Sequence, residues 1–330
     1  MPVKCFAFCL SSSGSYANYQ EKICHETMRK IAFGYSTRCN IQCEHCVAAD
    51  GGRKGKTKMD LSQAKKIIVE LAHAHVQGIS FTAGEPLIYL DDICELLALC
   101  ETYGIYTRVV TNSFWAKSPE NAQSYIARLM ESGLSQLRLS YSRWHQKNVK
   151  QKNIVNAAQS CLKNGLDYFV SFVTDFSEED ILYEEYLRQH DIRFFPEPVI
   201  FSGRAGSLAR APICTDYQDN CCPMNPYLAP DFDMYACCDA GSHFTKTNFF
   251  YLGNARQSSI EELFLKSESN ALYKHIRCMG ISGIASFAGF LAKDIITYRK
   301  CELCEQLFNS PESLKMLERE ADSGLTGWYR

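Results

Sequence analysis

The chain has 330 residues, of which 46% are apolar and 22% charged, so it can form a sizeable core and is neither disordered nor collagen-like. Its 35 basic and 37 acidic residues leave a net charge of -2, so neither sign is in large excess for binding nucleic acid or an anionic membrane. The longest apolar stretch, residues 284–296, is interrupted by polar and charged side chains, and the first ten residues lack the features of a signal peptide. We therefore expect a cytoplasmic protein with no transmembrane helix and no nucleic-acid partner.

From about Lys30, short β-rich runs alternate with longer amphipathic stretches, which is typical of repeated βα units around a parallel sheet. The predicted strands are residues 31–36, 78–82, 105–111, 136–140, 168–173 and 192–200. The predicted helices, from apolar spacing near 3.6 residues, are 61–76, 90–103, 120–132, 149–164 and 178–190. Gly104, Gly133 and Gly165 follow three of these helices as expected stops. A full eight-stranded barrel usually needs about 250 residues, so the pattern predicts an α/β fold of the partial (β/α)6 TIM-like barrel type.

The amino-acid composition of the sequence changes after Gly203. Residues 203–252 are rich in Pro, Asn, Asp, Gly and Cys, which indicates a smaller domain without a large apolar core. A helix is expected over 258–273, with Ser258 or Ser259 as its N-cap. The expected organisation is an N-terminal extension (1–30), a barrel (31–205), a small cysteine-rich C-terminal domain (206–310) and a helical tail (311–330).

Seventeen cysteines are unusual for a chain of this length. An odd number without a signal peptide argues against a disulfide framework and favours reduced thiols that bind metal. Cys94, Cys100 and Cys161 lie among apolar residues of predicted helices, so we expect them to be small buried hydrophobic residues.

The first predicted strand is followed directly by Cys39-Asn-Ile-Gln-Cys43-Glu-His-Cys46. Three thiolates this close together, on a loop, can bind three irons of a cubane cluster and leave the fourth iron without a protein ligand. Structural zinc normally uses four ligands in two separated pairs. His45 lies between Cys43 and Cys46, where joint tetrahedral ligation would be cramped. The pattern therefore favours an iron–sulfur cluster over zinc.

With its cysteine triad in this place, the sequence resembles the radical S-adenosylmethionine (SAM) enzymes, whose fold is a partial (β/α)6 barrel. The resemblance implies that Cys39, Cys43 and Cys46 hold a 4Fe–4S cluster whose unique iron binds the amino and carboxylate groups of SAM. It further implies that an electron from this cluster cleaves SAM to methionine and a 5′-deoxyadenosyl radical.

Three further segments resemble family motifs that contact SAM. Residues 82–86, Thr-Ala-Gly-Glu-Pro, resemble the GGEP motif that holds the methionine amino group, with Ala83 in place of the first glycine. Polar residues also end the third and fourth predicted strands, where the family binds the ribose and carboxylate. The SAM contacts implied in this way are Gly84, Glu85, Pro86, Thr111, Asn112 and Ser140. Ordinary turns and strand-end capping are the alternative interpretation of all three segments.

The second half of the chain resembles the auxiliary-cluster extension of the SPASM and twitch subgroup. Its signals are Cys221-Cys222-Pro, a segment that ends in Cys237-Cys238, Leu-Gly-Asn before a helix, and Cys301-Glu-Leu-Cys304. No cysteine follows Cys304, so the match is closer to the twitch form, which holds one auxiliary 4Fe–4S cluster. The ligands implied are Cys222, Cys237, Cys301 and Cys304. A zinc site built from the same four is the alternative. Substitute ligands, hydrogen-atom donors or inert thiols are the interpretations left for Cys214, Cys221, Cys238 and Cys278.

Other polar residues near the predicted strand ends have two interpretations. Tyr141, Arg143, Trp144 and His145 face substrate or form a polar loop with aromatic anchors. For Arg204 the two interpretations are bidentate binding of a carboxylate and an exposed position at a domain junction without such a role.

The resemblance implies hydrogen abstraction from a substrate C–H bond, and oxidative modification or crosslinking of a ribosomally made peptide is the favoured reaction. Only about 30 residues precede the first predicted strand, whereas many peptide-modifying relatives carry a leader-recognition domain there. We therefore expect either a separate peptide-presenting protein or a small substrate, and dehydrogenation of a sugar or aminocyclitol is the first alternative. A non-catalytic iron–sulfur electron carrier is the second. The electron donor implied is a flavodoxin or a ferredoxin.

Overall fold

The computed structural model describes residues 28–47, 57–201, 203–208, 222, 224–238, 249–288 and 300–322. The chain forms two compact units, which are described separately below. The larger unit comprises Arg29–Cys214 and Asn225–Ser267. The smaller unit comprises Met1–Met28, Thr215–Met224 and Glu268–Arg330.

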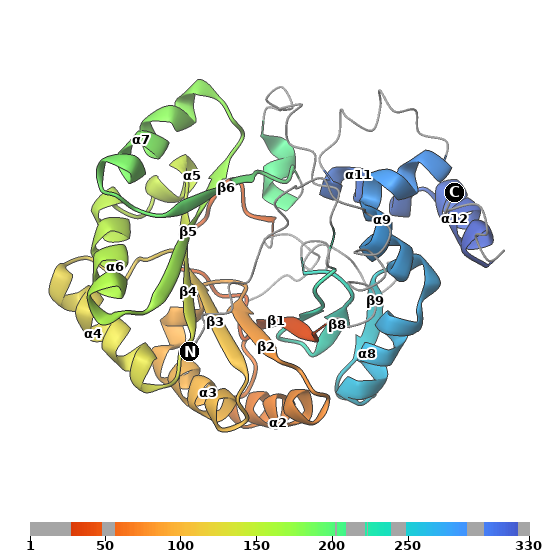
Figure 1. Ribbon diagram of the computed structural model, residues 1–330, viewed down its shortest axis with the longest axis horizontal. Helices are drawn as coiled ribbons and strands as arrows, with labels where there is room; N and C mark the ends of the chain where they lie inside the picture. Colours follow the sequence, from red (N-terminus) through yellow and green to blue (C-terminus); the bar gives the residue numbers. More distant parts are fainter. Residues whose placement is uncertain are drawn as a thin grey trace, which may run out of the picture. The chain divides into compact units, whose positions relative to one another are not determined.

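Six strands of the larger unit form a parallel sheet in which each strand pairs with the next along the chain (Figure 1). They are β1 (Lys30–Gly34), β2 (Gly78–Thr82), β3 (Tyr106–Thr111), β4 (Gln136–Tyr141), β5 (Asp167–Thr174) and β6 (Phe194–Pro198). The helices between them are α2 (Leu61–His73), α3 (Leu90–Thr102), α4 (Pro119–Glu131), α5 (Arg143–Gln146), α6 (Gln151–Asn164) and α7 (Ile181–Gln189). This confirms the predicted α/β fold with a partial, open (β/α)6 arrangement.

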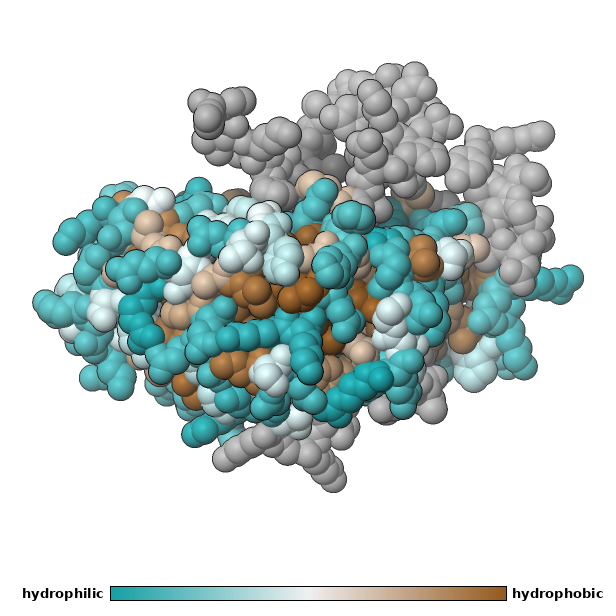
Figure 2. Space-filling view, turned by 90° about the horizontal axis from the view of Figure 1, so that it is seen from below, coloured by the Kyte–Doolittle hydropathy of each residue, from teal (hydrophilic) through white to brown (hydrophobic). Residues whose placement is uncertain are grey.

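Alternation along the strands assigns their residues to two faces. In β4, Leu137, Leu139 and Tyr141 are fully buried, whereas Arg138 and Ser140 lie on the opposite, partly open face. The outer helices are amphipathic, and from below, where α2 and α3 lie, mostly hydrophilic side chains are seen with apolar residues between them (Figure 2).

Local sequence signals set several helix ends. The Asp60 side chain accepts hydrogen bonds from the amides of Ser62 and Gln63 and so caps α2. Gly165, with φ of 72°, ends α6 in the left-handed conformation that glycine adopts most readily, as predicted. The predicted helix over 178–190 is divided into a 3-10 turn, η3 (Glu178–Asp180), and α7.

The parallel sheet continues beyond β1. Strand β7 (Tyr227–Leu228) pairs in parallel with β1, and β8 (Asp233–Tyr235) and β9 (Tyr251–Asn254) follow in antiparallel order. The sequence patterns did not predict these strands, because two to four residues are too few to show a period. Part of the cysteine-rich segment therefore belongs to the same sheet as the barrel strands.

The helix predicted over 258–273 is two helices. Helix α8 (Ile260–Ser269) begins with a capping box, in which Ser259 and Glu262 each accept a hydrogen bond from the backbone amide of the other. Asn270 then ends the run, because its side chain accepts a hydrogen bond from the Tyr273 amide and caps α9 (Ala271–Phe287). The prediction of one helix was wrong because apolar spacing does not reveal an internal cap.

The secondary-structure elements described in the smaller unit are helices. Helices α9, α11 (Lys300–Asn309) and α12 (Pro311–Asp322) contact one another, and α12 covers much of the expected tail. Among the residues that the structure describes, no helix is long and apolar enough to cross a membrane. The domain boundaries expected from the sequence remain a proposal, since compactness divides the chain at other positions.

Candidate active site

A pocket of about 470 Å³ lies at the carboxyl ends of the parallel strands in the larger unit. In open α/β sheets and barrels this end is where ligands bind. The predicted residues that line it are Cys39, Cys43, Cys46, Gly84, Glu85, Thr111, Asn112 and Ser140. Pro86 is not among the lining residues, because it begins the 3-10 turn η2 (Pro86–Tyr89) and is buried there.

The three cysteines of the loop after β1 all face this pocket. Burial, with a smaller contribution from neighbouring thiols, raises the pKa of the Cys39 thiol to about 11 and that of Cys43 to about 12. Without a metal these thiols are therefore protonated at neutral pH, and a metal must displace their protons to bind. Three soft sulfur donors on one loop, with open pocket beside them, fit a cluster that needs three protein ligands.

The cysteine loop is attached to the end of β2. The Glu85 amide donates a hydrogen bond of 2.8 Å to the Arg38 carbonyl. The preceding residue, Gly84, has φ of +58°, and a Cβ atom on it would lie 2.3 Å from the Arg38 carbonyl oxygen. Only glycine permits this approach of two backbones. Ala83 also has positive φ, at 67°, so the departure from the family's first glycine leaves an alanine in an unfavourable conformation.

Arg204 holds the other side of the cysteine loop. It lies on the short 3-10 turn η4 (Gly203–Ser207) and donates from Nε to the Cys43 carbonyl at 3.0 Å and from its amide to the Cys46 carbonyl at 3.3 Å. The side chain thus positions the loop, which is a role that neither sequence interpretation of Arg204 included.

Glu85 is the most constrained acidic group of the pocket, with 1% of its surface exposed. Its carboxylate accepts hydrogen bonds from the Leu87 amide (3.1 Å), the Thr111 hydroxyl (2.8 Å) and the Asn112 amide (2.7 Å). Burial raises the pKa of Glu85 to about 7, although these three donors act in the opposite direction. A cationic ligand beside this carboxylate would favour its ionised form.

Hydrogen bonds also connect β3 to the cysteine loop. Asn112 Nδ2 donates to Asn40 Oδ1 at 2.9 Å and lies 3.9 Å from Cys39 Sγ. The Trp115 indole donates to the Thr111 hydroxyl at 3.0 Å, so that hydroxyl is oriented toward Glu85. The ends of β2 and β3 and the cysteine loop therefore form one connected network.

Sequence reasoning did not single out two polar side chains of the pocket, Arg138 and Ser171. Arg138 donates to Ser171 Oγ at 2.9 Å and to the Glu197 carboxylate, and all three line the pocket. Arg138 could have been predicted, because it lies two residues from Ser140 on β4 and so points to the same face of the sheet. Ser171 is the residue of β5 that pairs with Ser140.

Residues 141–145, at the end of β4 and just after it, are mostly buried. Trp144 and His145 are buried, and only His145 of this segment reaches the pocket. Arg143 is bound by the carboxylates of Asp175 and Asp180 and stacks over the Trp144 ring. Burial lowers the pKa of His145 to about 4. For Arg143 and Trp144 the structure therefore favours the polar loop with aromatic anchors over direct substrate contacts.

The predicted auxiliary ligands do not share one unit. Cys237 follows β8 in the larger unit, and the others belong to the smaller unit: Cys222, Cys301 and Cys304. The auxiliary cluster accordingly remains a prediction. Cys278 is disulfide-bonded, contrary to the expectation of reduced thiols. Cys214 and Cys221 lie outside the described residues.

Two of the three cysteines predicted to be inert are in the core. Cys100 and Cys161 are completely buried in α3 and α6, as expected. Cys94 is only partly buried.

Residues 34–183 match the model of the radical SAM superfamily. This part of the chain is a radical SAM domain. It contains the cysteine loop, Glu85, and strands β2 to β5, so the pocket described above is built mainly from it. The radical SAM family uses a 4Fe–4S cluster and SAM, and the three facing thiols fit the cluster.

The chain is also similar to proteins of known name and structure. The PqqA peptide cyclase of Rhodopseudomonas palustris is 26% identical over 104 residues, which are 32% of this chain and 26% of the relative, so the match spans about a quarter of that protein. The structure titled native anSMEcpe with bound AdoMet has a TM-score of 0.56 at 14% identity, over 89% of this chain and 99% of the other. BtrN in complex with AdoMet and 2-DOIA has a TM-score of 0.51 at 14% identity, over 78% and 89%. These two structures share the fold.

Proposed function

We propose that this chain is a radical SAM enzyme that abstracts hydrogen from a C–H bond of its substrate. The observation that supports this most strongly is that three thiols of one loop and the buried carboxylate of Glu85 line the same pocket. When bound there, a 4Fe–4S cluster supplies the electron that cleaves SAM to methionine and a 5′-deoxyadenosyl radical. A pocket of about 470 Å³ has a size typical of small-molecule sites.

The side chains of the pocket have distinct proposed tasks. Cys39, Cys43 and Cys46 hold three corners of the cluster. Glu85, kept in place by three hydrogen-bond donors, accepts the ammonium group of the methionine moiety. No basic side chain among the described residues bonds to this carboxylate, so it is available to a cationic ligand. Asn112 provides a further polar contact beside Cys39.

The two strand-end hydroxyls have separate proposed tasks. Ser140 contacts the ribose of SAM. Thr111 is engaged with Glu85 and orients that carboxylate rather than SAM itself. Gly84 acts through its backbone, because a side chain there would displace the cysteine loop.

For the substrate, we propose a ribosomally made peptide that is oxidised or crosslinked. The relative with the name PqqA peptide cyclase supports a peptide. In such a reaction a substrate hydrogen atom passes to the 5′-deoxyadenosyl radical and forms 5′-deoxyadenosine, and the remaining carbon radical loses one electron and one proton. A twitch-type auxiliary cluster at Cys222, Cys237, Cys301 and Cys304 is the proposed electron acceptor. A flavodoxin or ferredoxin as electron donor and a separate peptide-presenting protein complete the proposal.

Anaerobic reconstitution with iron and sulfide, followed by reduction in the presence of SAM, tests the reaction class. The proposal requires 5′-deoxyadenosine above the level of a sample without reductant. A reconstituted cluster that leaves SAM intact would support the non-catalytic electron carrier instead.

The substrate class needs a second measurement. A candidate peptide encoded beside this gene should lose two hydrogens in mass spectrometry, in stoichiometric relation to the 5′-deoxyadenosine formed. Loss of two hydrogens from a sugar or aminocyclitol, with the peptide unchanged, would support dehydrogenation of a small molecule.

A further inference from the structure

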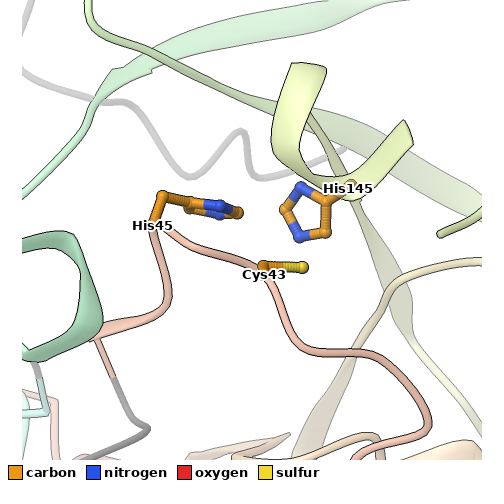
Figure 3. A group of neighbouring side chains, drawn as sticks. All are labelled: Cys43, His45 and His145. Carbon is orange, nitrogen blue, oxygen red and sulfur yellow. The ribbon is translucent and has the colours of Figure 1, made fainter. Parts of the chain in front are cut away.

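Three potential metal ligands meet at the edge of the pocket. Cys43 and His45 belong to the cysteine loop, and His145 belongs to α5, about 100 residues away in the sequence (Figure 3). Their ligating atoms all lie within 4.8 Å of one another. Cys43, His45 and His145 are 6%, 7% and 8% exposed, so water competes little for these atoms.

The two imidazole rings are held in place, and part of their hydrogen-bonding capacity is unused. His45 Nδ1 is buried and has no hydrogen-bond partner among the described residues. Its ring stacks on Trp144 at 5.0 Å and meets the His145 ring edge-on at 4.5 Å. The Ser142 hydroxyl lies 2.7 Å from His145 Nδ1, which orients that ring and leaves Nε2 for another partner. A histidine held in this way through one nitrogen is typical of metal sites.

We propose that Cys43, His45 and His145 form a Zn²⁺ site in the cluster-free protein. One thiolate and two imidazoles are ligands that zinc prefers, and water can take the fourth position of a tetrahedral site. Zinc–ligand distances of about 2.0–2.3 Å place ligand atoms about 3.5 Å apart. The ligating atoms lie within 4.8 Å of one another. Side-chain rotations that shorten these separations by about 1 Å would thus bring the atoms to zinc-binding distance. The cramped set of Cys43, His45 and Cys46 is avoided, because the second imidazole comes from another element.

Zinc at this site excludes the iron–sulfur cluster, because Cys43 cannot serve both. This consequence rests on the proposed function, in which Cys43 is a cluster ligand, whereas the zinc site itself does not. Zinc would therefore hold the chain in an inactive form until it is removed, and the order in which the two metals reach the protein would decide how much active enzyme forms.

Cobalt(II) is a suitable probe, because it adopts zinc geometries and absorbs visible light. The full-length chain with Cys301→Ser and Cys304→Ser, which silence the second cysteine group, is reduced, freed of metal by a chelator and titrated without oxygen. We expect one equivalent of cobalt with tetrahedral d–d bands and a sulfur charge-transfer band, both removed by added zinc.

Substitutions in this background locate the ligands. His45→Phe keeps an aromatic ring against Trp144, and His145→Ala removes the second imidazole. Each should weaken cobalt binding by about 10- to 100-fold or more, since loss of a ligand costs at least as much as loss of a supporting hydrogen bond. Cys39→Ser is the matched control, because it disrupts the triad and leaves the proposed zinc site intact. Unchanged affinity in both histidine variants, or lost affinity in Cys39→Ser, would overturn the site.

The competition is measured separately by iron uptake. Chain preloaded with one equivalent of zinc should take up about four fewer irons on reconstitution than zinc-free chain, and His45→Phe should remove most of this difference. Equal iron uptake with and without zinc would overturn the competition. A chain that binds cobalt as expected but never cleaves SAM would contradict the proposed function and leave the zinc site supported, so the two failures are distinguishable.

Discussion

The two cysteine groups of this chain differ in how their members are brought together. Cys39, Cys43 and Cys46 share one loop and line one pocket. The second group comes from distant segments that are divided between the two compact units: Cys222, Cys237, Cys301 and Cys304. A short loop tied to two strand ends places its ligands through local contacts, whereas a distributed group depends on the packing of whole segments. The first group can therefore be tested by changes within one loop, and the second needs a count of clusters.

Removal of the first group should have the largest effect. We expect the triple variant Cys39→Ala, Cys43→Ala, Cys46→Ala to form no detectable 5′-deoxyadenosine, because the cluster loses all three protein ligands. Chromatography of the reduced reaction with SAM measures this. Cys100→Ala is the control and should retain cleavage, because Cys100 is buried in α3 and is not among the residues that line the pocket. Cleavage that persisted in the triple variant would refute the assignment of the first group.

Removal of the second group should have a smaller effect on SAM. In the variant Cys301→Ser, Cys304→Ser, the iron content of reconstituted protein should fall from about eight to about four per chain, with SAM cleavage retained. Substrate oxidation should be lost, since its electron acceptor is missing. Iron and sulfide analysis checks the first statement. If the wild type and the variant held the same amount of iron, and the wild type also held one zinc, the second group would instead be a zinc site.

The contact between β2 and the cysteine loop is tested at Gly84. We expect Gly84→Ala to lower the free energy of unfolding by about 3 kcal/mol or more, because positive φ and overlap with the Arg38 backbone both oppose a Cβ atom. Gly104→Ala is the matched control, since Gly104 has φ of +65° and a Cβ atom on it would meet no other atom within 4 Å. It should cost only about 1 kcal/mol. Equal losses in urea denaturation would show that the clash is absent.

The buried carboxylate of Glu85 predicts a pH dependence. Its pKa of about 7 in the folded chain lies above the ordinary value of 4.5, so the folded state holds an extra proton between these values. The stability that this proton contributes is complete below pH 4.5 and is lost as pH rises through 7, by about 3 kcal/mol in all.

The effect of Glu85 is isolated by comparison with Glu85→Gln. His145, with its lowered pKa, acts in the opposite direction below pH 6.5, so the wild type alone is not informative. The difference in unfolding free energy between the two proteins, without ligand, should shift toward the variant by about 3 kcal/mol from pH 4.5 to 8. A difference that does not vary with pH would contradict a raised pKa.

Ala83 should give the smallest effect. Relief of its positive φ by Ala83→Gly gains about 1–2 kcal/mol, and the greater freedom of glycine in the unfolded chain offsets about 0.5–1 kcal/mol of this. We expect a net gain of up to about 1.5 kcal/mol in the free energy of unfolding, measured by urea denaturation. Ala127→Gly, within α4, is the control and should cost about 1 kcal/mol. A comparable loss at both positions would show that Ala83 is not strained.

The periodicity of the sequence determined the alternating strands and helices, and the spacing of Cys39, Cys43 and Cys46 marked their loop as a candidate metal-binding loop, which does line the pocket. Both signals are local, because apolar periodicity and cysteine spacing each depend only on residues that are close together in the sequence. The glycine stops, such as Gly165, are local in the same way. These features could therefore be predicted from the order of the residues alone.

Only the tertiary structure decided which distant segments meet. It extended the sheet with β7 along β1, and it brought Arg138 to Ser171 and Glu197. It also placed His145 beside His45 and turned Arg204 toward the cysteine loop. Apolar periodicity reports which face of an element is buried but not which partner covers it, and these contacts join residues that are far apart in the chain.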